Sequence, residues 1–206
     1  MKKMRIVTIF LMLFTFALSG FAQGKGDLSK TELKAIKKQT KKFEKEGWKV
    51  RPGQKPIELQ LIRSYQWENE VNDDLTPKWI IIPGNGVSKS YEVARYVALN
   101  SLQSEFVRRA TYEMTAEIKR VLANEQKMMP DVEAVAELQA TESAKSIGQI
   151  SDVIYPLTEM ERNLSNGNIE VSISFATSTA NFKDVIKNGV NQALERIYKE
   201  SNEQTE

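Results

Sequence analysis

The stretch from Ser90 to about Gln126 constrains the fold more than any other part of the chain. Polar and charged residues fill most of its gaps, so the apolar period is near 3.6 and predicts one long amphipathic helix. A row spaced by four residues drifts about 40° per step around a helix, so its eight members cannot all face one neighbour. We expect the first half to pack on a sheet and the second half to need another partner. The apolar row is Ala94, Ala98, Leu102, Phe106, Ala110, Met114, Ile118 and Leu122.

Three segments carry strand signals. Lys78–Pro83 is aromatic and β-branched without alternation, which is typical of a strand covered on both faces. The Gly84-Asn85-Gly86 sequence that follows lacks the remaining residues of a dinucleotide fingerprint or a P-loop. We interpret it as a bulge or tight turn that brings Ala94 and Ala98 close to the sheet.

The other two strands are predicted at Ile150–Arg162 and Ile169–Ala176, joined through Asn166-Gly167 as a hairpin. The second alternates cleanly, with Ile169, Val171, Ile173 and Phe175 facing inward. A two-residue turn would place Arg162 opposite Val171 on the core face. Either a longer loop or a bulge is therefore needed.

Shorter helices are predicted on both sides of these elements. A capping box at Ser29 opens one that runs to about Glu46, and Gly47 ends it. Another runs over Ile57–Val71, with Leu59, Ile62, Tyr65 and Gln66 or Asn69 as its inner stripe. A third begins at Pro130, runs to about Lys145 and is expected to fold back on the distal part of the long helix as a helical hairpin. A last helix runs from Ser178 or Thr179 to about Tyr198.

These elements predict an α+β fold. A small, mainly antiparallel sheet of about three strands is packed by the long central helix and the C-terminal helix, with the helical hairpin as an extension. The predicted organisation is a signal peptide at 1–22, an N-terminal helical layer at 23–77, the α+β core domain at 78–200 and a disordered tail at 201–206.

Two residue types are missing from the sequence, and their absence restricts the kinds of catalytic and metal site that the chain can form. The 206 residues include no cysteine and no histidine, which removes disulfides, thiol nucleophiles, Cys/His zinc sites and histidine acid–base catalysis. No serine or lysine stands in a convincing nucleophile pattern, and no feature selects a pair of carboxylates. We therefore predict a protein that is not an enzyme, with no catalytic residue, no metal site and no cofactor.

The N-terminus has the layout of a secretory signal peptide. Lys2, Lys3 and Arg5 form a basic region, Ile6–Leu18 is apolar, and small residues precede a cut after Ala22. We expect an exported protein in the periplasm, or extracellular and associated with the outer membrane. The mature chain would keep 26 basic residues against 27 acidic ones, which does not favour a nucleic-acid partner.

The first mature helix carries a lysine-rich outer face. One interpretation is a solvated face, and the other is a contact surface for anionic lipid, lipopolysaccharide or an acidic partner. The residues concerned are Lys30, Lys34, Lys37, Lys38, Lys41, Lys42 and Lys45.

Three tryptophans are the second candidate surface. Trp48, Trp67 and Trp79 lie in the first half of the chain and could stack against a glycan, although packing in a core or interface is the commoner use of such residues.

The order of elements also carries a resemblance. A strand ending at Gly84 and Gly86, a long helix opening with Ala94, Ala98 and Leu102, a second helix, the Asn-Gly hairpin and a final helix resemble a group of exported, uncharacterised proteins of Gram-negative gut bacteria. The pattern over about 78–198 is distantly similar to the twenty-kilodalton membrane-associated lipoprotein family and to the N-terminal domain of a flagellar ring assembly protein. These families imply an envelope-associated, lipoprotein-like module without catalytic residues. This chain lacks the cysteine that would be lipidated.

Together these features predict an exported cell-envelope protein that acts as a non-enzymatic interaction or structural module. Its expected partners are an envelope protein, a second copy of itself as a homo-oligomer, or an anionic membrane or polysaccharide surface. The alternative is a carbohydrate- or peptidoglycan-binding protein that uses surface tryptophans. A purely structural homo-oligomer is the third interpretation.

Overall fold

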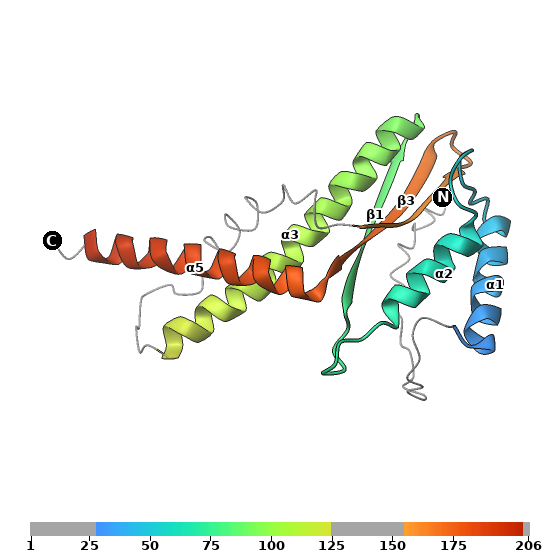
Figure 1. Ribbon diagram of the computed structural model, residues 1–206. Coiled ribbons are helices and arrows are strands. Elements are labelled where there is room, and N and C mark those ends of the chain that lie inside the picture. The colour runs from blue at the N-terminus through green and yellow to red at the C-terminus, as the bar shows by residue number, and fades with distance from the viewer. Residues whose placement is uncertain (1–27, 125–154, 204–206) are drawn as a thin grey trace, which may run out of the picture.

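The computed structural model describes residues 28–124 and 155–203, and it has the α+β architecture predicted above (Figure 1). The predicted signal peptide at 1–22, the Pro130–Lys145 helix and residues 204–206 lie outside the described residues. The elements are α1 (Lys30–Lys45), α2 (Ile57–Glu68), β1 (Trp79–Ser88), α3 (Tyr91–Asn124), β2 (Tyr155–Asn163), β3 (Ile169–Ser178) and α5 (Thr179–Glu203).

The three strands form one antiparallel sheet in the order β1-β3-β2. The hairpin prediction is resolved in favour of the longer loop, because the strands end at Asn163 and Ile169 and the turn takes in Leu164 to Asn168. Arg162 then pairs with Glu170 and not with Val171. Its guanidinium forms an ion pair of 2.7 Å with Glu170, which removes the buried charge that a two-residue turn would create.

The Gly84-Asn85-Gly86 sequence is not a turn, and this prediction was wrong. Strand β1 continues through it to Ser88, still paired with β3. The expected close approach of the long helix is confirmed, because both glycines are buried directly under α3. An added Cβ on Gly84 would lie 2.7 Å from the Leu102 Cβ, and one on Gly86 would lie 2.5 Å from the Ala98 nitrogen. The glycines therefore let the helix rest on the strand without breaking it.

Helix α3 buries all eight members of its apolar row, and its two halves have different neighbours. The first half packs on β1 and β3, as predicted. The distal half packs on α5, and near the middle of α3 the Phe106 and Phe182 rings meet edge to face at 5.5 Å between centroids. Helix α5 extends away from the sheet along this distal half and runs to Glu203, five residues beyond the predicted end (Figure 1).

The opposite face of the sheet is covered by α2, with α1 as the outermost layer (Figure 1). A second hydrophobic core lies there, made by Ile36, Trp48, Ile57, Leu61, Tyr65 and Met160. The predicted inner stripe of α2 was wrong at Leu59, which is half exposed. Tyr65 faces inward as predicted. The helix also turns Ile57 and Leu61 inward, because it is held between β2 on one side and α1 on the other.

Candidate functional site

A groove of about 650 Å³ lies between the distal half of α3 and the part of α5 from Thr179 to Leu194. Buried and half-buried apolar side chains line it, contributed mainly by α5. Its apolar lining is Ile80, Val121, Phe182, Ile186, Val190 and Leu194.

The charges at the groove are divided by sign between the two helices. Helix α3 contributes Glu113 and Glu117, whereas α5 contributes Lys183 and Lys187. Hydrogen bonds from the Arg120 guanidinium lower the pKa of Glu117, so this carboxylate is ionised at neutral pH. The groove thus has an acidic side, a basic side and an apolar lining between them.

The lysine-rich face of α1 is fully exposed. All seven lysines point outward in this outermost layer, while Ile36 and Thr40 of the same helix are buried against α2. The capping box predicted at Ser29 is confirmed, because the Ser29 hydroxyl accepts a hydrogen bond from the Glu32 nitrogen and the Glu32 carboxylate accepts one from the Ser29 nitrogen.

The three tryptophans are not equivalent. Trp48 is buried in the second core, with the Arg162 guanidinium 4.5 Å over its ring, so it offers no surface to a sugar. Trp67 and Trp79 are half-buried and stack on each other at 4.1 Å, with the Tyr155 ring edge-on to both. Arg63 lies 5.0 Å over the Trp67 ring, so little of this ring is left for a glycan.

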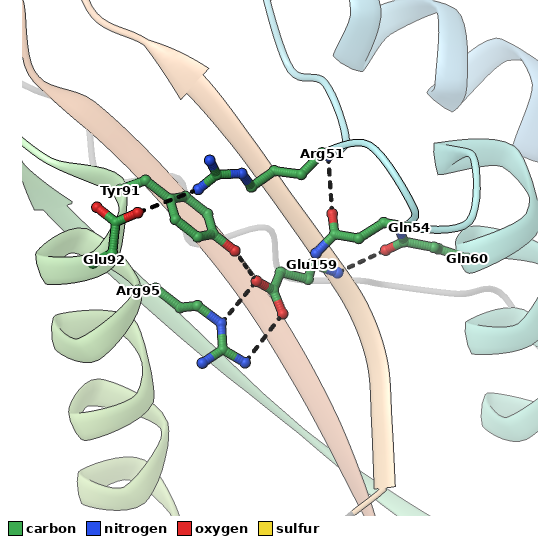
Figure 2. A network of polar contacts seen from close by, with 7 residues as sticks. All are labelled: Arg51, Gln54, Gln60, Tyr91, Glu92, Arg95 and Glu159. Atoms are coloured by element: carbon green, nitrogen blue, oxygen red, sulfur yellow. Dashed lines mark hydrogen bonds and ion pairs between the residues drawn. The ribbon is translucent and has the colours of Figure 1, made fainter.

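The structure also reveals a polar network around Glu159 that the sequence did not indicate (Figure 2). The Glu159 carboxylate on β2 accepts hydrogen bonds from the Tyr91 hydroxyl and from Arg95 Nε at 2.8 Å, both on the first turns of α3. The Glu159 backbone nitrogen donates to the Gln60 Oε1 of α2 at 2.6 Å. One residue thus joins helices on both faces of the sheet.

The electrostatics of this network suit a structural tie. Partial burial acts to raise the pKa of Glu159, but the hydrogen bonds from Arg95 and Tyr91 outweigh it and the net shift is downward. Burial and the neighbouring carboxylate raise the pKa of Tyr91. Both oxygens of this ionised carboxylate already accept hydrogen bonds from Tyr91 and Arg95, so we interpret the network as a link between layers.

Two further properties of the described residues bear on the site. No group of three or more acidic side chains is placed there to hold a metal ion. No helix in the same residues combines the length and the apolar character needed to cross a membrane.

Comparison with known proteins gives no relative. No protein-family model, curated protein or solved structure matches the chain. The resemblance to envelope families therefore depends on the sequence pattern alone.

The sequence predicted the α1 lysines and the tryptophans as candidates, but it missed the groove. It placed no candidate residue on α5, and the Pro130–Lys145 helix that it expected beside the distal half of α3 lies outside the described residues. One signal was available. The apolar positions of α5 from Phe182 to Ile197 cover a wider arc than a single helix contact uses.

Proposed function

We propose that this protein is an exported, non-enzymatic interaction module of the cell envelope, and that it binds a partner protein in the α3–α5 groove. The observation that carries the proposal is the groove itself, with its apolar lining between an acidic and a basic side. The signal-like N-terminus and the absence of histidine and cysteine support export and a role without catalysis.

The groove fits an amphipathic helix. Helix-in-groove recognition uses an apolar stripe at i, i+3, i+4 and i+7, and the lining residues of α5 offer a matching apolar track. The charges on the two sides of the groove would then set the orientation of the bound helix and select the partner, because a helix with the wrong charges on its flanks would be repelled. The bound helix would carry a basic flank over Glu113, since Glu117 is already paired with Arg120, and an acidic flank over Lys183 and Lys187.

Site-specific photo-crosslinking tests this proposal. A photoreactive residue in place of Ile186, inside the groove, should capture a partner when the protein is produced in its own bacterium. The control position is Tyr112, which is 72% exposed on α3 and outside the groove lining. Mass spectrometry of the captured peptide should show an amphipathic helical pattern with the charges given above.

Charge reversal makes the test specific. Lys183→Glu with Lys187→Glu should reduce capture from position 186 by about fivefold to tenfold, since exposed ion pairs contribute up to about 1 kcal/mol each. Equal capture at positions 186 and 112, or capture that ignores the reversal, would refute groove binding. A crosslinked pair of identical chains would instead support the homo-oligomer interpretation. A crosslink within one chain to the predicted Pro130–Lys145 helix would refute partner binding, because that segment would then fill the groove.

Glycan binding is the second candidate. It depends on Trp67 and Trp79, because these two rings reach the surface together beside Tyr155. Their mutual stacking leaves less ring surface than a sugar platform needs. Binding on a glycan array that is lost in a folded Trp67→Ala variant would favour this candidate over the groove.

A further inference from the structure

We infer that the outer face of α1 binds an anionic lipid bilayer. At about 100° per residue, its seven lysines fall in an arc of about 140° centred opposite the buried Ile36. All seven are exposed, and the helix is the outermost layer on its side of the sheet (Figure 1). The face runs about 22 Å from Lys30 to Lys45.

The acidic residues of this segment, Glu32, Glu44 and Glu46, lie outside the arc, and the exposed Glu44 lies about 20° from its edge. Glu32 is turned toward α2, where its carboxylate accepts a hydrogen bond from the Asn69 amide at 2.9 Å. Glu46 lies within 4.0 Å of Arg162 on β2 and 3.9 Å from Lys42. The lysine face therefore presents positive charge with no carboxylate among its own members.

The orientation of this face is fixed by packing. Ile36 is fully buried in the second core, and Thr40 on the same side of the helix is buried as well. The Tyr65 hydroxyl of α2 donates to the Gln39 Oε1 at 3.0 Å. The helix cannot turn its lysines inward without breaking these contacts, so the charges stay directed away from the molecule.

The form of the charge favours a bilayer over a folded acidic partner. Every cation in the arc is a lysine, a hydrated point charge, and not an arginine that forms paired bonds with one carboxylate. The residues form a convex row, and none of them lines the groove described above. A broad sheet of phosphate headgroups matches such a row, since attraction to it grows with the number of lysines near the surface.

Vesicle co-sedimentation of the chain without residues 1–22 tests the inference. Vesicles of phosphatidylglycerol mixed with phosphatidylcholine should bind the protein at low salt and release it at high salt, and vesicles of phosphatidylcholine alone should not bind it. Replacing Lys37, Lys38 and Lys41 with glutamine should weaken binding on the order of 100-fold, because each lysine contributes about fivefold at an anionic surface.

The matched control removes the same charge elsewhere. Lys55, Lys89 and Lys199 are exposed lysines outside α1 and outside the groove, and their replacement by glutamine should leave vesicle binding within about twofold. Circular dichroism would verify that both variants are folded. Equal weakening by both triple variants, or no binding to the anionic vesicles at low salt, would overturn the inference. Retention on a soluble polyanion without binding to vesicles would also overturn it.

The proposals for the groove and for the lysine face can be refuted independently of each other. The lysine face and the groove lie at opposite ends of the molecule, with the sheet between them (Figure 1). Vesicle binding needs no partner protein, and crosslinking from position 186 does not use α1. Bound to a bilayer through α1, the protein would keep its α3–α5 groove directed away from the surface.

Discussion

Substituting Gly86 by alanine should be among the most destabilising small changes in the chain. The added Cβ would lie 2.5 Å from the Ala98 nitrogen and 3.0 Å from the Val97 carbonyl carbon, whereas ordinary contact begins at 3.4 Å. All of these are backbone atoms, so no side-chain rotation can relieve the overlap. Helix α3 must move outward by roughly 1 Å at this turn, enough to remove a quarter to a half of the attraction in each contact.

The contacts at risk include the fully buried Ala94 and Ala98 and the β1 residue Ile82 below them. Overpacking a core costs about 1–3 kcal/mol when side chains can adjust. Because backbone must move here, we expect Gly86→Ala to lower the free energy of unfolding by about 2–4 kcal/mol.

Urea unfolding followed by tryptophan fluorescence and circular dichroism would measure this loss. Asn85→Ala is the matched control, because Asn85 lies between the two glycines on the same strand and its side chain is exposed. We expect it to change stability by no more than about 0.5 kcal/mol. If Gly86→Ala unfolds at the same urea concentration as Asn85→Ala, the close packing of α3 on β1 described above is wrong.

Three further predictions concern charges and one strained residue. Hydrogen bonds from Arg108, and then from Arg109, lower the pKa of Glu105 from 4.5 to about 2. Above pH 4.5 the free energy of unfolding of the wild type should therefore exceed that of Glu105→Gln by about 1 kcal/mol, after allowing for solvent screening. The difference should disappear as the pH falls toward 2. A double-mutant cycle between Arg95 and Glu159 should give a coupling of about 1 kcal/mol, since both side chains are partly exposed, and a value near zero would exclude the tie. Leu75 is exposed and has a φ of 63°, in the left-handed region that asparagine tolerates better than leucine. Leu75→Asn should therefore raise the free energy of unfolding by about 0.5–1 kcal/mol and raise the melting temperature. Leu75→Val should lower the melting temperature.

Much of the fold could be predicted because its main signals are local. The period of the long helix, the capping box at Ser29 and the alternation of β3 each follow from residues close together in sequence. The continuation of β1 through Gly84 and Gly86 could not be predicted in this way. Glycines usually mark turns, and only the close passage of α3 over the strand makes them favourable inside it.

The candidate sites differ in the same way, because one depends on local sequence and the others depend on contacts between distant segments. The lysine arc on α1 is a property of one helix, so helical spacing alone predicts it. The groove requires the docking of α5 on α3, and the Glu159 network requires α2, β2 and α3 to meet. The residues that pair in that network are 64 to 99 positions apart, and no periodicity links them.

Glu159 bonds to both of the helices on which the two proposed surfaces depend. Its side chain bonds to α3, whose distal half forms one wall of the groove, and its backbone bonds to α2, on which α1 is packed. Both surfaces therefore depend on helices that are bonded to the same strand residue. Because α3 also packs on β1 and β3 through a buried core, loosening this tie alone should leave both surfaces in place. Arg95→Ala should thus leave vesicle binding and capture at position 186 each close to wild type, and a marked loss of either one would show that the surface concerned needs this tie.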